Sequence, residues 1–171
     1  MAQEVTIQEY TPKWLEAYEQ EHKEIRLALQ DKAVSIEHIG STSVVGLPAK
    51  PILDIAVGVN RLHEADSWIE PLSKLGYEYV PKPEFPNRRF FRKGEWRKGT
   101  HHLHVYEVSG VEWAHNLLFR DYLRTHPDKL LEYANLKKQL ASLYSEDRAL
   151  YTEMKAPFIQ SVIELAKQLH S

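Results

Sequence analysis

Apolar and polar residues follow two different patterns along this chain, and the change of pattern predicts its organisation. In the first 110 residues, stretches with an apolar side chain at every third or fourth position alternate with shorter, nearly continuous or alternating apolar stretches. The first pattern is typical of amphipathic helices and the second of strands. The expected elements, in chain order, are a helix over residues 12–30, strands over 33–39 and 51–60, a helix over 61–75 and a strand hairpin over 88–93 and 100–108.

The second part of the chain keeps the helical pattern. It predicts three further helices, over residues 111–125, 128–144 and 150–169. Proline lacks the amide hydrogen that a helix interior needs, so we expect Pro127 and Pro157 to interrupt the helices. No repeat and no Gly- or Ser-rich linker divides the sequence. We therefore expect one α+β domain over residues 1–171, with a small mixed sheet and flanking helices in 1–110 and a C-terminal helical bundle in 111–171.

Composition and charge exclude several classes of function. The chain carries 22 Lys and Arg against 24 Asp and Glu, a formal net charge of -2 that gives no general attraction to nucleic acid or to a membrane surface. We expect neither as a partner, so any site for an anion must be a local patch. No stretch approaches the ~20 apolar residues that span a bilayer, and the first residues lack the features of a signal peptide, so we expect a cytoplasmic protein. The absence of cysteine excludes disulfides and cysteine-ligated zinc.

One charged side chain interrupts the apolar strand over residues 51–60. Alternation places Asp54 on the same face as Ala56 and Gly58, opposite the larger apolar side chains. A solvated aspartate usually has polar neighbours, whereas these small neighbours leave room for a ligand or metal ion beside the carboxylate. The alternative is that Asp54 accepts a hydrogen bond from a neighbouring backbone group.

Histidine is unusually frequent in this chain, with nine residues, three of them within four positions. On the strand over residues 100–108, His102 and His104 share a face while His101 takes the other. Two residues of strand span roughly 7 Å, so the two imidazoles suit a shared metal ion or a shared anionic ligand. Together with Asp54 they would form a set of two histidines and one carboxylate. Histidines in strands are also often structural.

A polar loop and scattered basic residues could hold an anion. The loop Gly40-Ser41-Thr42-Ser43 offers backbone N–H groups and three hydroxyls, although it lacks the spacing of a P-loop and such loops are often simple turns. Basic side chains that could complement it come from two later regions. They are Arg88, in a basic stretch with interleaved aromatic residues, and Arg120 and Arg124, one helical turn apart, for which Asp121 and Asp128 are alternative partners.

Residues 36–55, which read IEHIGSTSVVGLPAKPILDI, resemble the signature of the GrpB family of bacterial proteins, E-H-I-G-S-T-S-V-x-G-L-x-A-K-P-x-x-D-I. The resemblance continues in residues 102–105 and 119–124 and around Tyr151, and it covers nearly the whole chain. The chain departs from the family at Val45, where proline is usual, a change that affects the stiffness of the loop rather than its chemistry.

The resemblance implies a fold similar to the nucleotidyltransferase superfamily. By position, Gly40-Ser41 matches the turn that holds nucleotide phosphates in that superfamily, and Asp54 matches its first metal-binding carboxylate. The position of the second acid is Ala56 here, and the strand that would carry a third acid offers His102 and His104. One aspartate cannot hold two Mg²⁺ ions, and imidazole favours Zn²⁺, Mn²⁺, Fe²⁺ or Ni²⁺ over Mg²⁺.

These residues lead to two hypotheses of different class. The first is a nucleotidyltransferase-like enzyme that binds a nucleotide or another phosphorylated small molecule, with a divalent metal (Mg²⁺, Mn²⁺ or Zn²⁺) at Asp54, His102, His104 and Glu37. Its phosphate-binding groups would be Gly40, Ser41, Thr42, Ser43, Lys50, Arg88, Arg120, Arg124 and Lys155. The second is a module that binds a phosphorylated ligand, or assists folding, without turnover. The family resembles an extension of some dephospho-coenzyme A kinases for which a folding role has been suggested.

Overall fold

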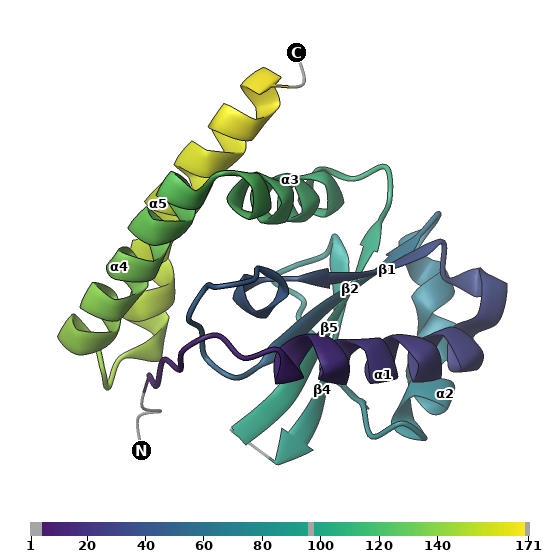
Figure 1. Ribbon diagram of the computed structural model, residues 1–171. Coiled ribbons are helices and arrows are strands. Elements are labelled where there is room, and N and C mark those ends of the chain that lie inside the picture. Colours follow the sequence, from purple (N-terminus) through teal and green to yellow (C-terminus); the bar gives the residue numbers. More distant parts are fainter. Residues whose placement is uncertain (1–4, 96–97, 170–171) are drawn as a thin grey trace.

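A computed structural model describes residues 5–95 and 98–169 of the protein. The chain is built around one five-stranded sheet (Figure 1). In spatial order the strands are β1 (Ser35–Ile39), β2 (Leu53–Val59), β5 (Lys98–Glu107), β4 (Arg88–Glu95) and β3 (Glu78–Tyr79). The helices are α1 (Lys13–Leu29), α2 (Ile69–Ser73), α3 (Val111–Thr125), α4 (Pro127–Leu143) and α5 (Arg148–Leu169). β2 and β5 pair in parallel, and the other neighbouring strands are antiparallel.

The face of the sheet that carries the large aliphatic side chains is covered by α1 and α2. Ile25 of α1, Leu72 of α2, Ile55 of β2 and Leu103 of β5 are all fully buried in one apolar cluster. Because strand side chains alternate, this burial turns Asp54 and its neighbours on the same face toward the opposite side of the sheet.

The opposite face of the sheet is divided into a packed part and an open part. Ala56 and Tyr106 pack beneath Trp113 of α3, which closes the region next to β1. The C-terminal helices α4 and α5 run side by side at the edge of the molecule, as Figure 1 shows. Between them and the sheet lies a cleft that is lined by Asp54 and Lys155.

The expected α+β class and the order of the main elements are confirmed. The strands over residues 33–39, 51–60, 88–93 and 100–108 and the three C-terminal helices are all present, with ends that differ by at most two residues from the expectation. No helix within the described ranges is long and apolar enough to cross a membrane.

Four local expectations need correction. Pro157 lies inside α5 instead of breaking it, and residues 62–68 form a 3₁₀ helix that leads into the short α2 instead of one α-helix over 61–75. Ser41–Ser43, expected as part of a loop, form a single turn of 3₁₀ helix. The two-residue strand β3 was not expected, because so short a segment cannot show the alternation of apolar and polar residues that predicts a strand.

Candidate functional site

Asp54, His102 and His104 meet on the open face of the sheet. The parallel register of β2 and β5 places Asp54 beside His102 and Ala56 beside His104, so the three polar side chains emerge together. The Oδ1 atom of Asp54 lies 3.6 Å from His102 Nδ1 and 3.4 Å from His104 Nε2. One potential ligand atom from each residue lies within 4.8 Å of the others.

This cluster fits a divalent transition metal. Two imidazoles and one carboxylate form a donor set that suits Zn²⁺, Mn²⁺ or Fe²⁺ better than Mg²⁺. The nitrogen of His104 that faces Asp54 is Nε2, while its Nδ1 atom is buried and has no hydrogen-bond partner among the described residues, so Nε2 is the atom that His104 offers to an ion.

The carboxylate of Asp54 is held in its charged form. Burial alone would raise the pKa of Asp54, but the neighbouring imidazoles of His102 and His104 bring it below its usual range. The Asp54 side chain keeps 31% of its surface exposed, so it remains accessible from the cleft. The arrangement therefore offers a permanent negative charge to a cation.

Gly40 lets the polar loop approach this carboxylate. Its backbone has φ +73° and ψ −174°, a region that is essentially restricted to glycine. A Cβ atom at this position would lie 2.7 Å from Asp54 Oδ2, which is closer than real contacts allow. The loop backbone and the Asp54 carboxylate are thus in contact only because this residue is glycine.

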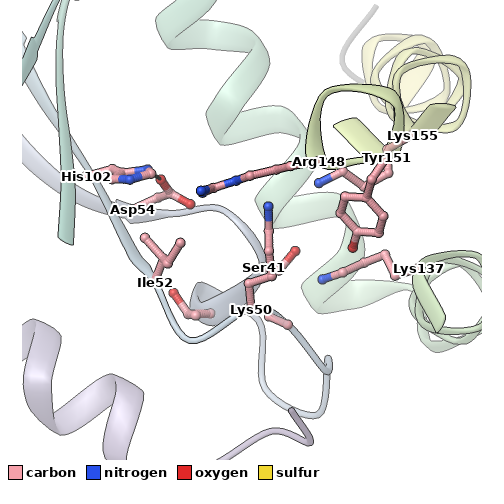
Figure 2. A pocket seen from close by; sticks show the side chains of 11 residues that line it. Ser41, Lys50, Ile52, Asp54, His102, Lys137, Arg148, Tyr151 and Lys155 are labelled. Atoms are coloured by element: carbon pink, nitrogen blue, oxygen red, sulfur yellow. Dashed lines mark ion pairs between the residues drawn. The ribbon is translucent and has the colours of Figure 1, made fainter. Parts of the chain in front are cut away.

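Four basic side chains surround a small cavity of about 110 Å³ beside Asp54. They come from three separate segments: Lys50 from the loop before β2, Lys137 from α4, and Arg148 and Lys155 from α5. Figure 2 shows these side chains extending from the loop and the helices toward the space in front of Asp54. Such convergence of cations is typical of a site for a polyanion.

The lysines of this cavity lose some of their affinity for protons. Burial and the charges of Lys155 and Arg148 lower the pKa of Lys50 to about 8. Burial and the charges of Lys155 and Lys50 lower the pKa of Lys137 to about 6, and burial also lowers the pKa of Lys155. An anion in the cavity would relieve the repulsion among these groups.

A second, larger cavity of about 430 Å³ adjoins the first. Ser41, Asp54 and Lys155 line both, so the two cavities meet at the candidate metal cluster. Arg88 of β4 lines the larger cavity, and its guanidinium lies 4.3 Å from the centre of the Phe85 ring. One face of α5 forms a wall of both cavities.

Within the loop, the hydroxyls have different roles. Ser41 lines both cavities, and Thr42 lines the small one while its hydroxyl hydrogen-bonds His38 Nε2 at 2.9 Å. Ser43 instead donates its hydroxyl to the carbonyl of Gly40, inside the turn. We therefore expect the hydroxyl of Ser41, and not that of Ser43, to contact a ligand.

Glu37 and two arginines proposed for the site lie outside both the cluster and the cavities. The Glu37 carboxylate lies 3.1 Å from Arg120 Nη1 and is not among the residues grouped around Asp54. Arg120 also donates to the carbonyl of His38, and Arg124 donates twice to the carbonyl of Ser43. Contrary to the expectation from sequence, these arginines hold the backbone before and within the polar loop and line neither cavity.

Sequence reasoning did not single out Lys137, Arg148 or Tyr151 for the site. One signal was available, because Arg148, Tyr151 and Lys155 have the i, i+3, i+7 spacing of a single helix face. Nothing comparable marks Lys137, which is 2% exposed and donates to the carbonyl of Pro48 at 2.7 Å.

No second carboxylate can stand at position 56 without a rearrangement. Ala56 is fully buried among Ile39, Tyr106 and Trp113. A longer charged side chain would have to displace these apolar groups or lose its hydration. The site is thus built for one carboxylate and two imidazoles.

Comparison with known proteins gives matches over most of the chain. The GrpB protein family matches residues 4–165. The UPF0157 protein YqkA of Bacillus subtilis is 38% identical over 161 residues, which cover 93% of this chain and 46% of YqkA. The glutamate-rich protein GrpB of Alkalihalophilus pseudofirmus is 32% identical over 164 residues, 94% of each chain. The chain therefore spans less than half of one relative and almost all of another.

This chain is also similar to part of a dephospho-CoA kinase. A dephospho-CoA kinase of Mycolicibacterium paratuberculosis is 27% identical over 181 residues, which cover 91% of this chain and 44% of that enzyme.

Solved structures give both a near and a remote match. The crystal structure of GrpB from Enterococcus faecalis has a TM-score of 0.88 and 36% identity, covering 96% of this chain and 99% of that one. The poly(U) polymerase Cid1 has a TM-score of 0.54 and 14% identity, covering 78% of this chain and 42% of the polymerase, which shows a nucleotidyltransferase-like fold. With the family match over residues 4–165 and these coverages, the chain belongs to the GrpB family.

Proposed function

We propose that this GrpB protein binds a phosphorylated small molecule, such as a nucleotide, in the cleft formed by the two cavities, and acts on it as a nucleotidyltransferase-like enzyme with a divalent metal. The observation that carries the proposal is the meeting of four basic side chains with the Asp54 cluster in one cavity of about 110 Å³. Like charges repel one another, and a polyanion is the ligand that offsets this repulsion.

The metal would be held by Asp54, His102 and His104. When bound there, it would supply positive charge to phosphate oxygens and so help to polarise a phosphorus centre. This chain's own residues would do the rest: Lys155 and Arg148 would neutralise phosphate charge, and Ser41 would donate to a phosphate oxygen from the loop.

A second candidate function is a binding or folding-accessory module without turnover. Its support is the buried Ala56 at the position of the second acid, together with the match to 44% of a dephospho-CoA kinase. Such a module would keep the anion site and the metal cluster but would not turn a nucleotide over. Release of pyrophosphate from a nucleoside triphosphate in the presence of Mn²⁺ or Zn²⁺, with water or an added hydroxyl compound accepting the nucleotidyl group, separates the two candidates.

Calorimetric titration with inorganic pyrophosphate tests the anion site. We expect the wild-type protein to bind pyrophosphate, and Lys155→Ala to weaken binding about tenfold or more, because it removes a half-buried cation from the point where the cavities meet. Lys167→Ala, on the same helix but paired with Glu164 on the surface, is the matched control and should bind as the wild type does. No binding by the wild-type protein would refute the proposal.

Calorimetric titration with Mn²⁺ or Zn²⁺ tests the metal site, and Asp54→Asn is the variant. The wild-type protein should bind about one equivalent of Mn²⁺ or Zn²⁺, and Asp54→Asn should lose this binding while it keeps its circular dichroism spectrum. Asp128→Asn, an exposed aspartate at the start of α4, is the control. Equal metal binding by the wild type and Asp54→Asn would place any ion elsewhere.

A further inference from the structure

The larger cavity differs in chemistry from the small one. Its walls contain six aromatic or aliphatic side chains: Phe85, Tyr106, Phe119, Tyr133, Ile159 and Ile163. Its volume of about 430 Å³ lies in the range of pockets that bury an organic ligand. Because it shares Ser41, Asp54 and Lys155 with the basic cavity, a ligand with phosphates in the small cavity would extend its organic part into the larger one.

Three polar side chains on one face of α3 line the larger cavity. Glu112, His115 and Asn116 have the i, i+3, i+4 spacing of one helix face and all line the cavity. The Asn116 amide donates to the backbone carbonyl of Glu112 at 2.8 Å, which fixes the orientation of the amide.

The Glu112 carboxylate has no hydrogen bond or ion pair within the part of the chain that the structure describes. It is half-buried and, apart from Asp54, the acid that lines this cavity. An ionised carboxylate only accepts hydrogen bonds, so its natural partner is a ligand that presents N–H donors. In a cleft otherwise dominated by cations, an acid at this place has no role in holding phosphate.

We propose that the larger cavity holds a heteroaromatic ring that carries an amino group, and that Glu112 selects this ring by accepting its N–H hydrogen bond. The proposal rests on the proposed function, since it assumes that the phosphates of the same ligand occupy the basic cavity. Aromatic walls suit a planar ring, and the carboxylate distinguishes an amino substituent from a carbonyl oxygen. A carbonyl oxygen at the same place would face the carboxylate with two acceptors and no donor.

Matched pairs of nucleotides test this selection. CTP carries an exocyclic amino group where UTP has a carbonyl oxygen, and ATP and inosine triphosphate differ in the same way. In each pair the adjacent ring nitrogen changes as well, from an acceptor in the amino form to an N–H donor in the carbonyl form. We expect the wild-type protein to bind CTP more tightly than UTP, and ATP more tightly than inosine triphosphate, by about tenfold in at least one pair, as a hydrogen bond to a charged group permits. Because Gln donates as well as accepts, Glu112→Gln should abolish or reverse that preference.

Two controls make the outcome specific. Glu112→Gln should bind inorganic pyrophosphate as the wild type does, and Glu16→Gln, an exposed acid in the first turn of α1, should keep the wild-type nucleotide preference. If the wild type binds pyrophosphate but neither pair shows a preference, or if Glu112→Gln keeps the preference, the selection by Glu112 is refuted and the anion site stands. If the wild type does not bind pyrophosphate, the proposed function fails first.

Discussion

Gly40 and Ala56 set the space around Asp54 as much as the charged residues do. Gly40 allows the loop backbone to touch the carboxylate, and Ala56 lets Trp113 close the sheet beside it. Strand alternation predicted that His102 and His104 would share a face, the resemblance to nucleotidyltransferases grouped Asp54 with them, and the structure brings the three together. The contact with Gly40 was not predictable, because a backbone conformation with positive φ at that position depends on how the loop folds back on the sheet.

Gly40→Ala should both destabilise the protein and remove metal binding. The new Cβ would lie 2.7 Å from Asp54 Oδ2 in a backbone region that disfavours side chains, so we expect the free energy of unfolding to fall by about 1–3 kcal/mol. Gly46→Ala is a matched control, since Gly46 also has a positive φ of +88° but a Cβ there would meet no described atom within 4 Å. Chemical denaturation and a Mn²⁺ titration of both variants provide the comparison. Equal effects of the two substitutions would show that strain, and not the contact with Asp54, dominates.

At the scale of elements, α3 holds the strand and loop that carry the site. Arg120 is 8% exposed and bonds the Glu37 carboxylate, the Asp121 carboxylate and the carbonyl of His38. Arg124 bonds the carbonyl of Ser43 with two nitrogens, at 2.8 and 3.1 Å. The two arginines therefore position the polar loop from behind.

Arg120→Ala should lower the free energy of unfolding by about 2–4 kcal/mol, because it leaves a partly buried carboxylate and a buried carbonyl without their partner. Arg89→Ala is the control, since Arg89 forms a single 3.0 Å ion pair with the largely exposed Asp66 and should contribute about 1 kcal/mol or less. Urea denaturation measures both. A loss for Arg120→Ala no greater than that for Arg89→Ala would contradict the role of Arg120 as an anchor.

The same helix shows where sequence reasoning reaches its limit. The spacing of Arg120 and Arg124 predicted a shared face but could not tell whether that face would meet a ligand or backbone carbonyls, which depends on the tertiary position of α3. Pro157 was misjudged for a related reason. Buried side chains on both sides of it, Tyr151 before and Val162 after, hold α5 in place and offset the lost hydrogen bond, and a local rule cannot include that packing.

On the scale of the whole molecule, the basic cavity joins the N-terminal sheet to the C-terminal helices. Lys50 and Asp54 come from the sheet side, and Lys137, Arg148 and Lys155 from α4 and α5. Folding therefore collects cations that are far apart in the sequence, which costs stability in the absence of an anion. This cost depends on pH, since a lysine that loses its proton no longer pays for the burial of its charge and no longer repels its neighbours.

The free energy of unfolding should rise with pH between pH 6.5 and 9.5. The pKa of Lys137 is about 6 and that of Lys50 about 8 in the folded protein, against 10.5 for an ordinary lysine, so the unfolded chain binds more protons between these values. The cost is complete below the folded pKa and disappears as pH approaches the unfolded one. The free energy of unfolding should thus increase from pH 6.5 to 9.5, by at most about 1.4 kcal/mol per pH unit for each lysine.

Two perturbations should flatten this profile, each for the same reason. Lys137→Met removes one of the titrating groups, and saturating pyrophosphate would keep the remaining lysines protonated by supplying the opposite charge. Lys167→Met, on the exposed face of α5, should leave the slope unchanged. Denaturation curves at four pH values, with and without pyrophosphate, give the slopes directly. The prediction is contradicted if the free energy of unfolding of the wild type does not change from pH 6.5 to 9.5, or if Lys137→Met does not reduce its slope. Either result would mean that the three lysines of the cavity keep their protons when the protein folds. The cavity would then impose no loss of stability for an anion to offset.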